Sequence, residues 1–193
     1  MNFAALSAFI YEDLEAQITD VSSRKGSFEI RIGCDDPKED RRRHFVITCA
    51  GVKEVKISPD SFGGLSLAAE HPVLFDYIDD LGYLAFSSAP SVAEVVVARL
   101  YEAHQKICSD WRPFSRYANH HTRDGLVSLV RGGFGMLAQG PYCVMSAYQE
   151  AVGTILKTSL VKHEIKNKTA VQAVFLDDHF VIAEKIEAHE EKA

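Results

Sequence analysis

The sequence lacks the patterns that identify several common classes of protein. No stretch approaches the roughly 18 apolar residues that a membrane-spanning helix needs. The first 17 residues, MNFAALSAFIYEDLEAQ, contain an apolar patch but no basic region before it, unlike a secretion signal. The 193 residues include only 12 glycines and 6 prolines and no low-complexity segment. We therefore expect a globular, cytoplasmic protein that does not bind a membrane.

The cysteines also exclude familiar motifs. The chain has four of them, Cys34, Cys49, Cys108 and Cys143, and none forms a CxxC pair. Neither a zinc ribbon nor a thioredoxin-type motif is therefore present in the sequence. We expect free thiols in a reducing compartment, and no cofactor.

Excess positive charge is missing as well. The formal net charge is -6, whereas nucleic-acid binding requires clustered Lys and Arg, so we expect no nucleic-acid partner. The one basic run, RRRH at 41–44, directly follows the acidic DDPKED at 35–40. This pattern predicts a solvated loop of mixed charge.

Hydrophobic periodicity indicates an α+β fold with a mainly antiparallel sheet and flanking helices. Apolar residues at intervals of three and four predict a helix over about residues 2–18. Alternation in SFEIRIGC predicts a half-buried strand over 27–34. Ser91, followed three residues later by Glu94, forms a capping-box pattern at the start of a helix that reaches Cys108.

Further strands are expected on both sides of that helix. HFVITCAGVKEVKIS, residues 44–58, contains two strand-like runs around Gly51, and a meander is the simplest arrangement. HPVLFDYIDDLGYLAFSSAP, residues 71–90, favours a helix followed by a strand. Two apolar runs around an Asp–Asp turn predict a hairpin over 170–188, and its second strand could become helical at 183–192.

The length suits a single domain, residues 1–193. Sub-lobes at 1–108 and 126–193, joined by a loop at 109–125, are the expected subdivision. A match without gaps between VVARLYEAH at 96–104 and VIAEKIEAH at 181–189 raises the idea of two similar halves, although the shared residues are common in helices.

Four glycines in GGFGMLAQGP, residues 132–141, form the nearest approach to a phosphate-binding loop. A Walker loop needs Lys and Ser or Thr after its glycines, and this stretch has Met136, Leu137 and Ala138 instead. A dinucleotide fingerprint would require an uninterrupted helix, which Gly140 and Pro141 prevent. The stretch is therefore interpreted as a structural joint that positions the 109–125 loop and a helix after Pro141.

Two groups of residues could support chemistry. His104 and Cys108 are four residues apart on the predicted helix, a spacing that can hold two metal ligands, but burial of both in the core is the simpler interpretation and no metal is predicted. His120 and His121, with Asp124 nearby, could act as acid–base groups of a small hydrolase-like enzyme. No recognisable nucleophile accompanies them, so the prediction leans against an enzyme.

The 109–125 loop holds a compact aromatic and cationic cluster: Trp111, Arg112, Phe114, Arg116 and Tyr117. Trp, Tyr and Arg are the side chains that most often anchor protein interfaces. The same residues could instead attach the loop to the core. We predict that this cluster is the binding site.

The sequence thus predicts a cytoplasmic, non-enzymatic protein that acts by binding another protein. The acidic balance suits an inhibitor or immunity-type protein with a basic partner. A homodimer is a third possibility.

Overall fold

The structure is a computed structural model, and the chain folds as two compact units. Unit 1 comprises residues 1–74 and 169–193, and unit 2 comprises residues 75–168. The 109–125 segment therefore lies inside unit 2, not between two lobes. The structure describes residues 3, 6, 7, 10, 16–24, 26–36, 41–58, 60–119 and 125–191.

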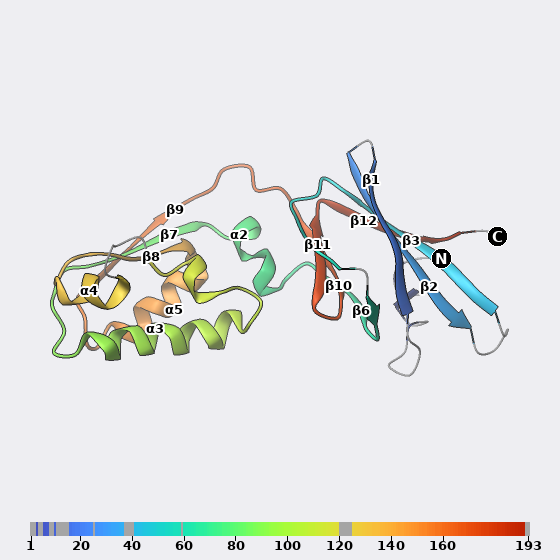
Figure 1. Ribbon diagram of the computed structural model, residues 1–193. Coiled ribbons are helices and arrows are strands. Elements are labelled where there is room, and N and C mark those ends of the chain that lie inside the picture. Colours follow the sequence, from blue (N-terminus) through green and yellow to red (C-terminus); the bar gives the residue numbers. More distant parts are fainter. Residues whose placement is uncertain are drawn as a thin grey trace. The chain divides into compact units, whose positions relative to one another are not determined.

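Unit 1 contains two antiparallel sheets (Figure 1). The first has the strand order β12-β3-β2-β1-β5 and the second the order β4-β11-β10-β6. A short 3-10 helix, η1 (Pro72–Leu74), follows β6. The strands are β1 (Ala16–Arg24), β2 (Ser27–Asp36), β3 (Arg41–Ala50), β4 (Glu54–Lys56), β5 (Ser61–Phe62), β6 (Leu65–Ala68), β10 (Gln172–Leu176), β11 (His179–Ala183) and β12 (Lys185–Glu190).

One hydrophobic core joins the two sheets of unit 1. Ile30 and Ile47 from the first sheet and Val174 and Val181 from the second belong to the same cluster and are fully buried. The alternation seen in the sequence explains this arrangement, because every second side chain of a strand faces the same side. The predicted strand at 27–34 and the hairpin near the C-terminus are thus confirmed.

Three local predictions for unit 1 differ from the structure in whole or in part. Residues 16–18 belong to strand β1 and not to a helix over 2–18; of the earlier residues, 3, 6 and 7 are helical. Within the predicted helical segment 183–192, residues 185–190 form strand β12, which pairs with β3. The basic run at 41–44 is part of strand β3 and not a loop.

Ion pairs across strands explain the placement of the basic run. Arg41 and Arg42 face Asp36 and Asp35 in the β2–β3 ladder. Arg43 forms two hydrogen bonds of 2.7 Å with Glu190 of β12 and lies 3.3 Å from a carboxylate oxygen of Asp36. Opposite charges on neighbouring strands stabilise this register, which a reading along the chain alone does not reveal.

Unit 2 is a three-stranded antiparallel sheet with helices. Its strand order is β8-β7-β9, and both neighbours pair with β7. The elements in chain order are α2 (Phe75–Ile78), β7 (Leu81–Phe86), α3 (Ala93–Cys108), η2 (Phe114–Arg116), α4 (Gly125–Arg131), β8 (Gly135–Pro141), α5 (Tyr142–Val152) and β9 (Thr158–His163).

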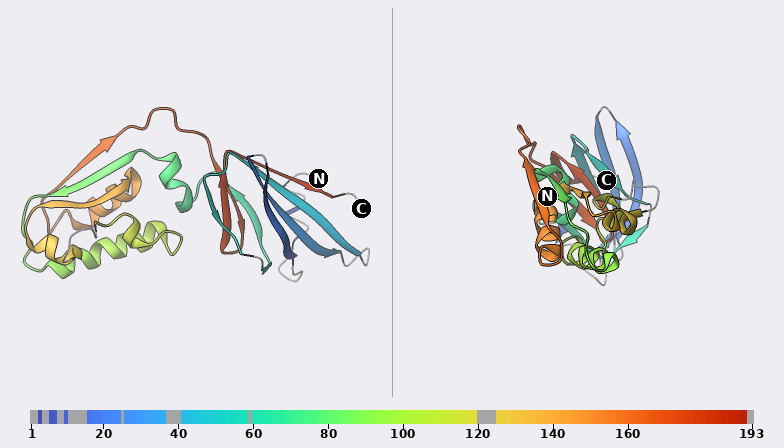
Figure 2. Two further views of the ribbon diagram at one scale, coloured as in Figure 1. Left: turned by 45° about the horizontal axis from the view of Figure 1, so that its top comes forward. Right: turned by 90° about the vertical axis from the view of Figure 1, so that its left-hand side faces the viewer.

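Helices α3, α4 and α5 lie on one side of the unit 2 sheet (Figures 1 and 2). Leu84 and Phe86 of β7 belong to the same core as Leu100 of α3 and Val144 of α5. The alternate residues of β7, including Tyr83, face the other side and are only half-buried. The sheet therefore has one side covered by these helices and one open side. No helix in the described ranges is long and apolar enough to cross a membrane.

Two sequence expectations change in unit 2. Helix α3 forms as predicted, but its N-cap is Val92 with no side-chain capping bond, and Glu94 pairs with Arg131 of α4. The matched nonapeptides also differ in structure: 96–104 lies in α3, whereas 181–189 runs through β11 and β12. Their sequence similarity is not accompanied by a similar fold.

Truncating Leu100 should destabilise unit 2 strongly. Leu100 is fully buried, so Leu100→Ala removes apolar contacts and leaves a cavity, at a cost of about 2–5 kcal/mol. Val95→Ala on the exposed side of the same helix should change the free energy of unfolding by less than about 0.5 kcal/mol. Urea titration followed by fluorescence of Trp111, the single tryptophan, measures both values. Equal effects of the two changes would contradict this core assignment.

Candidate functional site

The described part of the segment after α3, residues 109–119, contains more regular structure than the loop expected from its sequence. It contains η2, and Ala118 forms an isolated β-bridge with Ala138 of β8. The Asn119 N–H donates to Leu137 O at 2.7 Å, and the Gln139 N–H donates to Tyr117 O at 3.0 Å. The glycine-rich stretch is thus largely strand β8. One edge of β8 pairs with β7, and the other edge forms hydrogen bonds with the segment after α3.

The five predicted binding residues lie in unit 2 but differ in exposure. Trp111 and Phe114 are half-buried, and Arg116 is exposed. Arg112 and Tyr117 are almost completely buried. The cluster therefore combines the two sequence interpretations: part of it attaches the segment to the core and part of it faces solvent.

A buried hydrogen-bond network attaches this segment to the helices. His104 of α3 is fully buried, with Nδ1 2.8 Å from the Tyr148 hydroxyl and Nε2 2.7 Å from the Arg112 carbonyl oxygen. Because a carbonyl can only accept, Nε2 carries the proton and donates it. In the neutral ring Nδ1 then accepts from Tyr148. One imidazole thus connects α3, α5 and the segment that follows α3.

The His104–Cys108 pair does not form a metal centre in this arrangement. Both ring nitrogens of His104 are occupied by the contacts described above. Burial raises the pKa of the Cys108 thiol to about 11, which keeps it protonated at neutral pH. The part of the chain that the structure describes contains no group of three His, Cys, Asp or Glu side chains able to hold a metal ion.

Two arginines share one carboxylate beside this network. The Arg116 Nε donates to Asp76 Oδ2 at 2.7 Å. The Nε of buried Arg112 lies 3.8 Å from the same oxygen, an ion pair that is too long for a hydrogen bond. Asp76 of α2 therefore orients the exposed guanidinium of Arg116 and also lies close to that of Arg112.

Tyr117 packs closely against strand β8 because position 140 has no side chain. A Cβ atom added at Gly140 would lie 2.6 Å from Tyr117 Cδ1. Burial raises the pKa of the Tyr117 phenol, and its hydroxyl has no hydrogen-bond partner among the described residues. The glycine thus has a steric role at this strand and not a phosphate-binding role.

A hollow of about 390 Å³ lies where the open side of the sheet meets this segment. Leu81 and Tyr83 of β7 and Gln139 of β8 line it from the sheet. The remaining lining residues are Asp76, Arg116, Tyr117 and Gly140.

The open side of the sheet also presents apolar side chains. Met136 is 37% exposed and Val161 is 57% exposed. The strand register places Val161 opposite Tyr83 and Met136 opposite Ala85, so the four side chains form a continuous surface. We call these four residues the open sheet surface.

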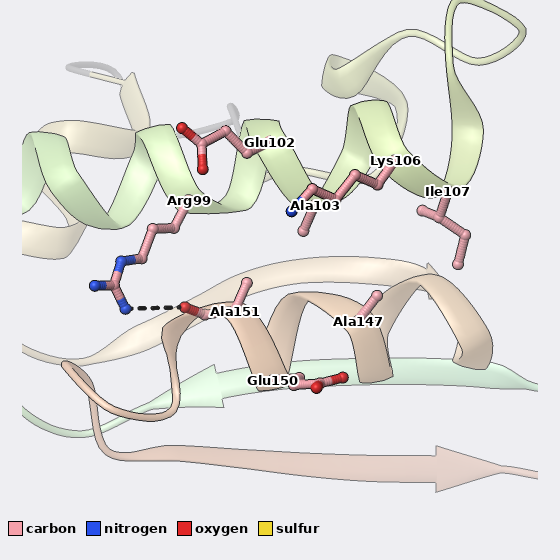
Figure 3. A pocket seen from close by; sticks show the side chains of 8 residues that line it. All are labelled: Arg99, Glu102, Ala103, Lys106, Ile107, Ala147, Glu150 and Ala151. Carbon is pink, nitrogen blue, oxygen red and sulfur yellow. Dashed lines mark hydrogen bonds between the residues drawn. The ribbon is translucent and has the colours of Figure 1, made fainter.

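A second hollow, of about 560 Å³, lies between α3 and α5 (Figure 3). Arg99 extends from α3 across one end, and its Nη1 donates to the Thr154 hydroxyl at 2.9 Å and to the Ala151 carbonyl at 3.4 Å. Two bases, Arg99 and Lys106, and two acids, Glu102 and Glu150, line it. Because these charges balance, this groove does not select the charge of a ligand.

The predicted acid–base residues cannot be placed in the site. His120, His121 and Asp124 lie outside the described residues. The half-buried thiol of Cys143, a further nucleophilic group in unit 2, has its pKa raised to about 12, mainly by burial.

Sequence reasoning missed Asp76, Tyr83 and Gln139, which have no local signal. They become neighbours of Arg116 only through the β7–β8 pairing and the short helix before β7.

Comparisons with protein-family models, with curated proteins and with solved structures find no match for this chain.

Removing the buried imidazole should destabilise unit 2. His104→Ala leaves the Arg112 carbonyl and the Tyr148 hydroxyl without their partner and creates a cavity, so we expect a loss of about 2–5 kcal/mol. Replacement of the exposed His163 by Ala should cost less than about 0.5 kcal/mol. Urea titration measures these losses, and nitrogen-15 NMR of the wild-type ring should show a protonated Nε2. A protonated Nδ1 with a bare Nε2 would contradict the network.

Adding a methyl group at Gly140 should displace the Tyr117 ring. We expect Gly140→Ala to destabilise the protein by about 1–3 kcal/mol through overpacking. In a Tyr117→Ala background the same change should cost clearly less, because the clashing ring is absent. A double-mutant cycle from urea titrations gives the coupling, and additive effects would disprove the proposed contact.

Proposed function

We propose that this protein is a cytoplasmic, non-enzymatic binding protein that contacts another protein through unit 2. The open sheet surface is the observation that carries the proposal. The solvent-facing side of an antiparallel sheet is commonly polar, but here Met136 and Val161 are exposed next to Tyr83 and Ala85. A continuous exposed apolar surface is a common property of protein-binding sites.

The segment after α3 extends this contact area in the proposal. Arg116 is exposed, and half-buried Phe114 packs edge to face against exposed Tyr101 with ring centroids 5.6 Å apart. Arg and aromatic residues contribute much of the binding energy in many interfaces. The buried Arg112 and Tyr117 would act indirectly, by holding the exposed residues in position.

The charge distribution supports a basic partner. Unit 1 has 18 Asp and Glu against 11 Lys and Arg, whereas unit 2 has 9 against 10. The negative field of unit 1 would speed the approach of a positively charged protein without requiring direct contact. An acidic inhibitor or immunity-type protein has these properties.

The cysteines support the proposed compartment. All four are free, and three of them are buried. Burial raises the pKa of Cys49 to about 12, so this thiol stays protonated and unreactive at neutral pH. Free thiols are the usual state in the reducing cytoplasm.

Placing a charge on the apolar open sheet surface should abolish partner binding. We expect the tagged full-length protein to retain one specific partner from native cell extract, and Val161→Glu to lose it because a charge would be buried in the interface. Capture followed by mass spectrometry measures the loss, which should exceed about tenfold. Circular dichroism checks that the variant remains folded.

Val95→Glu is the matched control, because Val95 is a similarly exposed valine on α3. It should retain the partner at the wild-type level. Equal capture by both variants, or no specific partner for the wild type, would contradict the proposal. Sedimentation of the purified protein identifies the remaining case, in which the partner is a second copy of this chain and Val161→Glu is monomeric.

A further inference from the structure

Strand β9 leaves one edge of the unit 2 sheet uncovered. The outer edge of β8 bonds to the segment after α3, whereas β9 is the last strand on the other side (Figure 1). The Ser87 N–H donates to Lys157 O at 3.0 Å, so the odd-numbered residues of β9 bond to β7. The backbone groups of Thr158, Leu160 and Lys162 therefore point away from β7. They have no hydrogen-bond partner among the described residues.

The uncovered edge continues in extended form to Ile165. The Ile165 N–H donates to Asp80 Oδ1 at 3.2 Å, next to the start of β7. Because backbone groups alternate in direction along a strand, Glu164 directs its N–H and C=O outward, as Lys162 does. All five residues from Val161 to Ile165 are exposed.

This edge lacks the features that usually prevent strands from pairing between molecules. Such features include proline, β-bulges and lysines that extend over the edge. Residues 157–168 contain no proline, and the β7–β9 register has no shift. Lys162 folds back toward its own unit, with Nζ 2.9 Å from Asp80 Oδ2 and 5.1 Å from the centre of the Tyr142 ring. The edge is therefore accessible to another strand.

The sequence that best complements this edge is the same sequence. Two antiparallel copies of VKHEI, residues 161–165, centred on His163, place Lys162 of each copy opposite Glu164 of the other. They also place Val161 opposite Ile165, which are 57% and 41% exposed. Opposite charges and apolar pairs that face each other across antiparallel strands are stabilising. By symmetry, each of these contacts occurs twice.

The backbone geometry is compatible with this register. Two antiparallel residues exchange a pair of hydrogen bonds only when both direct their backbone groups toward the other strand. Lys162 and Glu164 both point outward, and so they satisfy this condition in both symmetric pairs. A centre at Lys162 would set two lysines opposite each other, and a centre at Val161 would set Lys162 opposite Leu160. The charges therefore favour the centre at His163.

We propose that two copies of this protein pair through β9 and form one continuous antiparallel sheet with the order β8-β7-β9-β9-β7-β8. The twofold axis passes between the two His163 residues and is perpendicular to the sheet. The open sheet surfaces of both copies therefore lie on the same side and form one larger surface. Each outer strand is then a β8 strand that bonds to residues 117–119 of its own chain, so the assembly closes at two copies.

Sedimentation equilibrium of the purified full-length protein, from about 1 to 500 µM, tests the proposal. We expect a dimer with a Kd of about 10–100 µM, because the contact is small. Glu164→Pro removes an outward N–H but no bond to β7, and should weaken dimerisation at least tenfold. Circular dichroism checks that each variant remains folded.

A charge reversal with a matched control tests the pairing of side chains. Glu164→Lys sets like charges opposite each other at two symmetric positions and should weaken dimerisation at least tenfold. Glu150→Lys makes the same change at an exposed residue of α5 and should dimerise within twofold of wild type.

Single cysteine substitutions test the register. Residues that face each other at the axis without hydrogen bonds have Cβ atoms about 4.5–5.5 Å apart, close enough for a disulfide after a small adjustment. His163→Cys should therefore form a covalent dimer under mild oxidation, seen by non-reducing electrophoresis. Ser159→Cys, on the same side of the strand, should remain at the level of the wild type.

Several results would overturn the inference. These are a monomer at about 500 µM, unchanged dimerisation of folded Glu164→Pro, or crosslinking through Ser159→Cys in preference to His163→Cys. A monomer whose Lys162 and Glu164 amides are protected from hydrogen exchange only in a captured complex would assign the edge to a strand of a different protein, and would also contradict the proposed dimer.

The proposed dimer does not rest on the proposed function, and the two can fail separately. Dimerisation is measured on purified protein, without any partner. In the capture experiment the bait is kept below about 1 µM, where the dimer dissociates, so the effect of Val161→Glu reports on a different protein. A monomeric protein would leave that capture result intact, and a dimer without partner capture would contradict only the proposed function.

Discussion

The arrangement of unit 2 depends on satisfying one buried imidazole. His104 has no access to water, so each ring nitrogen needs a partner within the protein. Tyr148 of α5 supplies one and the Arg112 carbonyl supplies the other. These two bonds fix α5 against α3 and bring the chain after α3 back toward strand β8, where the bridge at Ala118 continues the attachment.

The position of Arg116 follows from this return of the chain. Arg112 is buried next to this network, and the carboxylate of Asp76 lies 3.8 Å from its Nε. Asp76 also accepts from Arg116, which lies four residues further along the chain and faces solvent. A requirement of the interior thus sets the position of the exposed guanidinium beside the open side of the sheet.

The elements that the sequence predicted well have a strong local period. The strand over 27–34, the helix ending at Cys108 and the hairpin around Asp177 and Asp178 all agree with the structure. The failures lie where partners from distant positions decide. The basic run at 41–44 became a strand through its pairing with β2 and β12, and the glycine-rich stretch became β8 through its pairing with β7.

The sequence by itself determined the α+β class, the main helix and several of the strands, because these depend on the spacing of apolar residues along the chain. It also singled out Trp111 to Tyr117 as a notable cluster. Only the tertiary structure decided which of those side chains face solvent and which are buried, and which residues surround Arg116. Those properties arise because Asp76, Arg116 and Gln139 line one hollow although they are 23 to 63 positions apart in the chain and have no common local pattern.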